Sequence, residues 1–577
     1  MKTKNPFLIN RLLHKAIPLY VLLLFFSTRI FGQANDRLLW DVRILSNKLG
    51  MPWEITYGPD DSLWVTEAKA YRIRKVSTVN GGKRTVLNLA NKKNFDRSAA
   101  TWPQGGLMGL ALHPDLMTGK PYVYVAYVYR FDSCTTTMPR NPCYFKTKIE
   151  RYTYNIGPNT LTSPVTVMDN IPGSNDHNSG RLTIGPDLKL YYTVGDMGAG
   201  QFGNQPRTEN AQNLNVYEGK ILRFNLEPDT DAADATDPFN RWIPNDNPYT
   251  NSVTGKVTAI YTYGHRNAQG IVWGRINLGD SLYSSEHGPQ SDDEVNIITR
   301  GKNYGHPYVM GYCDGNFNGI SNGPYTPSAS NGEQNACATY GLYGSQPIKT
   351  IFSTNSPNPN PESSNTTWPT VGPSSIDFYG YDVLPGWKNS LLITTLRNGR
   401  VIRLKLNSNG NAVGANGMNG TDTITYFNSA NGQSRYRDLC ISPDGLKIYV
   451  ATDSSGSTSG PTADITALPN NPGCILEFSF SGILSLKDMP ITPNEIRTEM
   501  KVYPNPANAV LNILVKRGVS KPMRIQLFDI TGKMIYQEFS NKDNFSIDVS
   551  DYNRGVYLLK IYNGSDIPVL TEKVILK

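Results

Sequence analysis

Between Trp40 and Phe480 one short unit recurs, and this recurrence limits the possible folds more than any other feature of the chain. Each unit has an apolar strand, a Gly-Pro-Asp or similar turn, a strand rich in Tyr, Val or Leu, and a third strand. Six such units can be read, for example ITYGPDDSLWVTE with YRIRKVS and LCISPDGLKIYVATDSS with CILEFSF. Small antiparallel sheets cannot bury both faces alone, so the pattern predicts an all-β, six-bladed β-propeller. A β-sandwich is the alternative, but the similar units are too many for one sandwich.

Composition and length support an all-β protein with more than one domain. Gly (51) and Pro (39) are plentiful, only 18% of residues are charged, and strong amphipathic helical repeats are missing. After Ser481 a linker leads to a short run of alternating strands, long enough for a small C-terminal β-sandwich. The predicted organisation is a signal peptide (1–34), a propeller (35–482), a linker (483–499) and a C-terminal domain (500–577).

The N-terminus has the pattern of a secretory signal. Lys2, Lys4, Arg11 and Lys15 precede an apolar run from Ala16 to Phe26, and small residues follow, which predicts cleavage between about 31 and 36. The run is too short for a transmembrane anchor, and no later stretch is long enough. Removing the signal lowers the net charge from +8 to about +3, so the basic composition does not indicate a nucleic-acid partner.

Six cysteines in an exported chain favour disulfides, although their connectivity stays open. The pairs considered are Cys134 with Cys143, Cys313 with Cys337, and Cys440 with Cys474 across the last two strands of the main domain. A metal or redox site is the alternative, but the sequence has no Cys-x-x-Cys motif or Cys/His cluster.

His177 is a candidate general base. It lies in a polar Gly/Ser/Asn loop, and a strand pair joined by a Gly-Pro-Asp turn leads from it to Asp196. A carboxylate that faces a histidine across a hairpin can fix its tautomer. The alternative is an ordinary surface histidine.

Loops at one face of a propeller converge on its axis, so segments distant in sequence can build one site. Three arginines on such loops, Arg397, Arg435 and Arg437, need anionic partners, which a ligand with several carboxylates would supply, although surface ion pairs are the alternative. The polar residues of these loops are Gln104, Gln201, Arg266, Asn267, Gln269, Arg397, Arg435 and Arg437.

A further loop combines the exposed Gly288-Pro289 backbone with Asp292, Asp293 and Glu294. Backbone carbonyls with nearby carboxylates suit a hard cation such as Ca²⁺. A solvated charged turn is the alternative.

Taken together, roughly residues 45–480 resemble the soluble glucose/sorbosone (aldose sugar) dehydrogenase family, whose members use pyrroloquinoline quinone (PQQ). The resemblance rests on motifs in the family's order and spacing: Gln104-Gly-Gly-Leu-Met-Gly, His113-Pro-Asp, Asp176-His-Asn-Ser-Gly-Arg-Leu, Gly195-Asp, Gly264-His-Arg-Asn-Ala-Gln-Gly, Gly288-Pro, Ser291-Asp-Asp-Glu, Gly301-Lys-Asn-Tyr-Gly, Trp368-Pro-Thr, Arg435-Tyr-Arg-Asp and Ser442-Pro-Asp-Gly.

This resemblance implies oxidation of the anomeric carbon of an aldose to a lactone, with an external electron acceptor. It implies that His177 is the base, that Asp196 orients it and that Arg266 stabilises charge on the quinone. The implied cofactor-binding residues are Gln104, Gln201, Asn267, Arg397, Arg435 and Arg437. The implied Ca²⁺ ligands are the carbonyls of Gly288 and Pro289, with Glu294, Tyr304 and Asp314 at a second, structural site.

Several positions depart from the family pattern. Arg397 replaces the usual lysine, His287 stands where the glucose enzyme has a glutamine, and Met310 replaces a small residue at the second Ca²⁺ site. The segment before Trp368 lacks a tyrosine that shapes the family's glucose site. The sugar pocket is therefore expected to be remodelled.

The C-terminal segment resembles the sorting domain of the type IX secretion system, through Tyr503-Pro-Asn-Pro, Phe528-Asp-Ile-Thr-Gly and Gly555-Val-Tyr-Leu-Leu. This implies export through the periplasm to the cell surface or beyond; a carbohydrate-binding or adhesive module is the alternative. Two other functions remain open for the propeller: a non-catalytic sugar- or protein-binding module, and a Ca²⁺-dependent lactonase.

Overall fold

The chain divides into two compact units, Met1–Ile483 and Leu484–Lys577, which are described separately. The computed structural model describes residues 28–31, 38–96, 102–135, 142–230, 239–277, 279–289, 292–315, 317, 332–351, 370–397, 399–414, 423–429, 434–454, 470–483, 499–517, 521–530, 532–562 and 568–577. Most of the predicted signal, most of the predicted linker and Trp368 lie outside these residues. Among them, no helix has the length and apolar character needed to cross a membrane.

Among its described residues, the first unit contains six antiparallel sheets. The first two are β3 (Pro52–Tyr57), β4 (Ser62–Glu67), β5 (Arg72–Ser77), β6 (Lys83–Asn88), and β7 (Leu107–Leu112), β8 (Tyr122–Cys134), β9 (Cys143–Asn155), β10 (Thr160–Ser174). The next two are β11 (Leu182–Ile184), β12 (Lys189–Val194), β13 (Lys220–Asn225), β14 (Ile260–Tyr263), and β15 (Ala268–Ile276), β16 (Gly279–Glu286), β17 (Asp293–Ile297), β18 (Lys349–Ile351). The fifth is β19 (Pro373–Tyr379), β20 (Ser390–Thr395), β21 (Val401–Lys405), β22 (Thr423–Tyr426).

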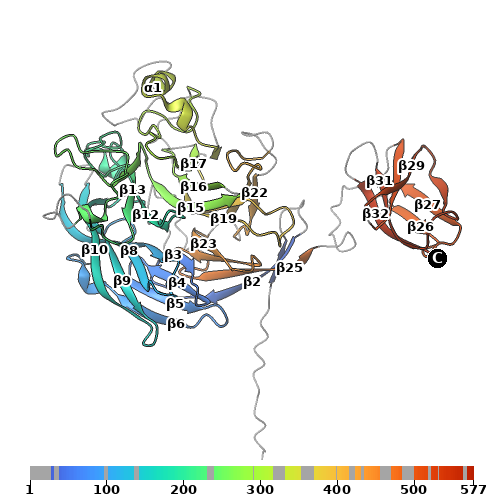
Figure 1. The fold of residues 1–577 in the computed structure, drawn as a ribbon, viewed down its shortest axis with the longest axis horizontal. Coiled ribbons are helices and arrows are strands. Elements are labelled where there is room, and N and C mark those ends of the chain that lie inside the picture. The colour runs from blue at the N-terminus through green and yellow to red at the C-terminus, as the bar shows by residue number, and fades with distance from the viewer. Residues whose placement is uncertain are drawn as a thin grey trace, which may run out of the picture. The chain divides into compact units, whose positions relative to one another are not determined.

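The sixth sheet combines both ends of the unit. Its strands, in spatial order, are β1 (Thr28–Phe31), β2 (Leu38–Ser46), β25 (Ile475–Ile483), β24 (Lys447–Thr452) and β23 (Tyr436–Ile441). In Figure 1 the blue β2 lies beside the orange β25. The sequence pattern predicted three strands per unit, and the sheets have at least four, because β2 and the irregular outer strands carry no turn motif. Strand β1 falls inside the predicted signal segment.

The first strands of the six sheets form a closed ring. Strand β3 contacts β7, β7 contacts β11, and the series continues through β15, β19 and β23 back to β3. Sheets of four strands in this arrangement fit a β-propeller (Figure 1).

The repeated Gly-Pro-Asp turns adopt the same conformation. Gly58 N–H donates to Ser62 O and Asp61 has φ +55°. Gly185 N–H donates to Lys189 O and Leu188 has φ +53°. The repeat seen in the sequence is therefore a repeat of local structure, with the turn at the same place in the first and third sheets.

Several strands of the six sheets are covered on both faces by neighbouring sheets. Every residue of β13, β20 and β23 is buried. Aromatic side chains fill the spaces between sheets, as in the edge-to-face contact of Trp64 with Tyr154 at 5.0 Å. Burial on both faces explains why these strands have apolar runs rather than strict alternation.

Arg181 ties the inner strands together on the ring axis. Its guanidinium Nη1 donates to Glu54 Oε2 (2.6 Å) and Asp438 Oδ2 (2.8 Å), and Nη2 donates to Ser374 O (2.9 Å). These partners belong to the first, sixth and fifth sheets, so one buried side chain cross-links much of the ring.

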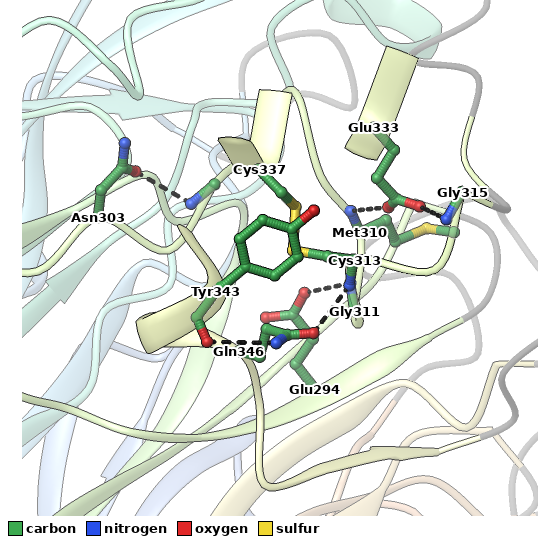
Figure 2. The surroundings of a disulfide bond; sticks show 11 residues. Glu294, Asn303, Met310, Gly311, Cys313, Gly315, Glu333, Cys337, Tyr343 and Gln346 are labelled. Carbon is green, nitrogen blue, oxygen red and sulfur yellow. Dashed lines mark hydrogen bonds between the residues drawn. A yellow bond between two sulfur atoms is a disulfide. The ribbon is translucent and has the colours of Figure 1, made fainter. Parts of the chain in front are cut away.

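Helical segments are short: α1 (Gly332–Tyr340), and the 3-10 helices η1 (Ala90–Lys92), η3 (Phe202–Asn204), η4 (Asn240–Trp242) and η5 (Leu342–Ser345). A disulfide between Cys313 and Cys337 links α1 to the preceding loop (Figure 2). Cys134 and Cys143 form a second disulfide across β8 and β9.

The third pair considered from the sequence is wrong, because Cys440 and Cys474 are free and buried. Cys440 lies in β23 and Cys474 directly precedes β25, with β24 between these two strands, and the two thiols pack in different hydrophobic clusters. A disulfide cannot span an intervening strand.

The described part of the second unit forms two sheets. They are β26 (Glu499–Tyr503), β27 (Val510–Arg517), β30 (Asn544–Asp548), and β29 (Met534–Ser540), β28 (Met523–Phe528), β31 (Gly555–Tyr562), β32 (Pro568–Leu576). One hydrophobic cluster contains residues of both sheets, including Ile513 and Ile525. Burial alternates along β30 and β31, as expected where one face packs and the other meets water.

Candidate active site

The predicted site residues come from connections at one end of the ring. Because neighbouring strands are antiparallel, the connections between sheets and those between the second and third strands of a sheet emerge at the same end. These connections, with the start of β23, carry Gln104, His177, Asp196, Gln201, Arg266, Asn267, Gly288, Pro289, Arg397, Arg435 and Arg437.

His177 and Asp196 form a direct pair. His177 Nδ1 lies 2.7 Å from Asp196 Oδ1, and the two side chains are 2% and 0% exposed, which excludes an ordinary surface histidine. A Cβ at Gly195 would lie 1.9 Å from the His177 carbonyl oxygen, so only glycine permits this approach. His177 itself has φ +51°, an unfavourable conformation that concentrates at functional sites.

Both carboxylate oxygens of Asp196 are fully engaged. Oδ1 also accepts the Gly198 N–H (2.7 Å), and Oδ2 accepts Gln201 Nε2 (3.1 Å) and meets His306 Nε2 at 3.0 Å. Burial alone would raise the pKa of Asp196, but the charges and hydrogen bonds of His177 and His306 hold it well below its ordinary value. Asp196 is therefore ionised.

Gln104 orders the histidine loop. Its Oε1 accepts the Asn178 N–H (2.8 Å), and its Nε2 donates to Asp176 Oδ1 (3.1 Å). Asp176 Oδ2 lies 3.6 Å from His177 Nε2, the ring nitrogen that does not face Asp196. A polar shell of loop residues thus surrounds the histidine.

Arg266 lies beside this pair and is 4% exposed. Its Nε and Nη2 donate to Gln201 Oε1 (3.0 and 2.5 Å), and its Nη1 donates to the His287 carbonyl (3.1 Å). Within the described chain no carboxylate makes an ion pair with it. Burial lowers the pKa of Arg266, but a guanidinium stays charged in proteins.

Two further arginines share a single carboxylate. Arg437 donates to Asp453 through Nε (3.0 Å) and Nη2 (2.7 Å), and Arg435 Nε donates to the same carboxylate (3.3 Å). Arg435 Nη1 also donates to the Leu396 carbonyl (3.4 Å), next to Arg397. Two buried guanidiniums therefore share one buried carboxylate. Asn267 directly follows Arg266 in the chain, and its side-chain Oδ1 accepts a hydrogen bond from the Ser179 hydroxyl (3.2 Å).

The Gly288-Pro289 turn is held by Asp293. This carboxylate accepts N–H groups of Gly288 (3.1 Å) and Val371 (2.7 Å), and burial raises its pKa to about 6. Asp293 thus fixes the turn that carries the two predicted carbonyl ligands.

The predicted second cation site lies around the loop from Met310 to Gly315 (Figure 2). Glu294 Oε1 accepts the Gly311 N–H (2.7 Å), and Glu333, which the sequence reading missed, accepts N–H groups of Met310 (3.1 Å) and Gly315 (2.8 Å). Burial raises the pKa of Glu294 to about 8 and that of Glu333 to about 7.

Asp314 lies within that loop, whereas the Tyr304 side chain points elsewhere. The Tyr304 hydroxyl donates to Ile297 O (2.5 Å), and its ring stacks on His265 at 4.7 Å.

The sequence reading also missed His306 and Glu209. Both are buried, and His306 Nε2 lies 3.4 Å from Glu209 Oε2. Burial alone would lower the pKa of His306, but Asp196 and Glu209 raise it to about 9. No local motif marks either residue, although His306 directly follows the Gly301-Lys-Asn-Tyr-Gly segment.

A ring of β-sheets with a buried histidine–aspartate pair and a cluster of buried arginines at one end defines a propeller of the quinoprotein dehydrogenase class. The model of one family, glucose/sorbosone dehydrogenase, matches residues 49–334 and 336–459. The chain belongs to this family.

Known relatives agree with this assignment. The chain is 35% identical over 474 residues to quinoprotein glucose dehydrogenase B of Acinetobacter calcoaceticus, covering 76% of this chain and 91% of the relative. It is 26% identical over 419 residues to aldose sugar dehydrogenase YliI of Escherichia coli, covering 72% and 90%. A crystal structure of a glucose dehydrogenase superposes with a TM-score of 0.50 and 21% identity, covering 76% and 99%, which supports the fold.

The C-terminal unit is a secretion system sorting domain, because that family model matches residues 501–577. A sorting domain of this kind directs export through the type IX system, so the chain is an exported member of its family.

Proposed function

We propose that this chain is a six-bladed propeller enzyme that oxidises the anomeric carbon of an aldose to a lactone, with PQQ as the immediate electron acceptor. Residues 35–482 would form the propeller and residues 500–577 a small sandwich that directs export. The observation that best supports this proposal is the His177–Asp196 pair. Beside it lies the buried Arg266, whose guanidinium makes no ion pair with a carboxylate in the described chain.

His177 acts as the general base in this proposal. Because Nδ1 faces the ionised Asp196, the ring carries its proton on Nδ1 and presents the Nε2 lone pair. Nε2 removes the proton of the anomeric hydroxyl while the anomeric C–H bond breaks. Asp196 then stabilises the imidazolium, and the lactone carbonyl forms from the C–O bond that remains.

The charges of the site fit PQQ, a planar quinone with three carboxylates. Arg435 and Arg437 share one carboxylate, and Arg266 is buried against neutral oxygens, so a ligand anion would compensate charge that the protein leaves unbalanced. When bound, this cofactor supplies the carbonyl that takes the anomeric hydride, and an external acceptor reoxidises it. Gln104, Gln201, Asn267 and Arg397 complete the proposed binding set.

The residues also fit Ca²⁺. Asp293 holds the Gly288-Pro289 turn whose carbonyls would bind one ion. Glu294 of β17 and Glu333 of α1 are buried carboxylates with raised pKa, and both accept N–H groups of the 310–315 loop. A cation would compensate their charge, so we place the second ion there with Asp314 and the Tyr304 backbone oxygen.

The full chain mixed with PQQ, Ca²⁺ and an artificial dye acceptor tests the reaction. We expect reduction of the dye with several aldoses and formation of the matching lactone. D-Glucose should not be clearly preferred, since an unpaired buried group in an epimer costs only about 1–3 kcal/mol. Absence of turnover with any aldose, despite bound quinone, would refute the function; a glucose kcat/KM more than about 10²-fold above all others would refute only the broad specificity.

A further inference from the structure

The histidine–aspartate pair continues into a second buried pair behind it. Asp196 Oδ1 faces His177, and Asp196 Oδ2 faces His306 at 3.0 Å. His306 Nε2 lies 3.4 Å from Glu209 Oε2, and the side chains of His306 and Glu209 are 6% and 1% exposed. The four groups run in the order His177, Asp196, His306, Glu209.

His306 is itself held firmly in place. Its backbone N–H donates to the Gly264 carbonyl (2.9 Å), and its own carbonyl accepts Gln212 Nε2 (2.6 Å). Glu209 is anchored by the Ala211 N–H, which donates to its Oε1 (2.7 Å). The backbone of His306 is therefore fixed, and its ring places Nε2 between two carboxylates.

A metal site is the other reading of these groups, because Asp196, Glu209 and His306 place three potential ligand atoms within 4.8 Å of one another. The oxygens of Asp196 already meet four donors, including the His306 ring, so this carboxylate has no oxygen left for an ion. Hydrogen bonds account for Asp196 and His306 without an added ligand, and Glu209 Oε2 lies at ion-pair distance from the His306 ring.

We propose that His306, oriented by Glu209, is a positioning residue that keeps Asp196 aimed at His177 Nδ1. The inference rests on the proposed role of His177 as the base. Asp196 can turn about its side-chain torsions. Gln201 Nε2 (3.1 Å) and His306 Nε2 (3.0 Å) both hold the oxygen that His177 does not use, and we assign the orienting role to the hydrogen bond from His306. Without it, Asp196 loses the alignment that sets the tautomer of His177.

Matched substitutions of His306 in the full chain test this role. The amide nitrogen of Gln reaches about as far as Nε2, whereas that of Asn corresponds to Nδ1 and falls short. His306→Leu and His306→Asn should lower kcat about 10-fold, less than loss of the base itself. KM and the affinity for PQQ should stay within about twofold, and His306→Gln should retain most of the activity.

A readout without turnover separates this proposal from the proposed function. In the histidine-labelled full chain, the downfield N–H proton of His177 is identified by its loss in His177→Ala. It should persist in His306→Gln and disappear in His306→Leu and His306→Asn. If the wild-type chain shows this proton but oxidises no aldose, the function fails while the positioning role stands.

Two results would overturn the proposal. One is an unchanged His177 proton and wild-type kcat in His306→Leu. The other is equal damage in His306→Gln and His306→Leu with a matching loss of thermal stability, which would indicate packing alone. Glu209→Ala with an unchanged proton and unchanged kcat would remove Glu209 from the chain of contacts.

Discussion

At the residue scale, the site is a set of buried charges whose partners are unequally distributed. Asp196 meets two imidazoles, whereas the Arg266 guanidinium donates only to neutral oxygens in the described chain. Buried charges normally have opposite partners, because the desolvation of an unpaired ion is expensive. An imbalance of this kind is expected where a charged ligand completes the site.

Replacement of His177 tests the base directly. His177→Ala should lower kcat by about 10²-fold or more, because the anomeric proton loses its acceptor. Binding of PQQ, followed by its absorbance, should be retained. His113→Ala is the control, because His113 lies in a turn at the opposite end of its sheet and accepts the Asp115 N–H. Near wild-type turnover of His177→Ala would remove this residue from the mechanism.

Glu54 gives the fold a predicted dependence on pH. Burial raises its pKa from 4.5 to about 8, against the lowering effect of Arg181. Between these values the folded state holds a proton that the unfolded state releases, so stability falls as pH rises through this range. Glu54→Gln should match the wild type near the lower end of the range and have a higher thermal midpoint near the upper end. An equal difference at both ends would contradict the shift.

At the element scale, the features predicted correctly from the sequence are those determined by residues close to one another along the chain. The Gly-Pro-Asp turns and the hairpin that joins His177 to Asp196 are of this kind. His306 could not be placed, since it reaches Asp196 from a segment 110 residues away. The pairing of Cys440 with Cys474 failed for the same reason, because strand order decides it and sequence distance does not.

The loop that holds Asp314 should depend on calcium. Glu294 and Glu333 are buried beside it, and a bound cation would stabilise their charged forms. Chelation should therefore abolish activity and lower the thermal midpoint, and Ca²⁺ with PQQ should restore both. Mg²⁺ should restore them poorly, because it prefers strict octahedral geometry and retains its waters. Unchanged activity after thorough chelation would contradict the metal assignment.

At the scale of the whole molecule, the two units have separate hydrophobic cores. The clusters of the ring contain residues up to Phe478, and a different cluster fills the sorting domain. The contacts between residues also divide the chain into two compact units, with the boundary after Ile483. This separation lets the ring and the sorting domain fold independently.

A chain that ends at Ile483 should fold and retain full activity, since β25 ends at that residue and completes the sixth sheet. In the native host the same truncation should stop export and leave the protein in the periplasm. Activity of the purified protein and cell fractionation check the two outcomes. Insolubility of the truncated chain, when the full chain is soluble, would mean that the second unit stabilises the ring.

The pairing of β2 with β25 also has a kinetic consequence. Trp40 of β2 lies opposite Phe480 of β25. The two strands whose pairing closes the ring therefore come from near the start and near the end of this unit. Contacts between such distant segments form late, because the intervening chain must lose its freedom first. We expect the ring to remain open until its last strand has been synthesised, so that closure of the ring follows completion of the whole first unit.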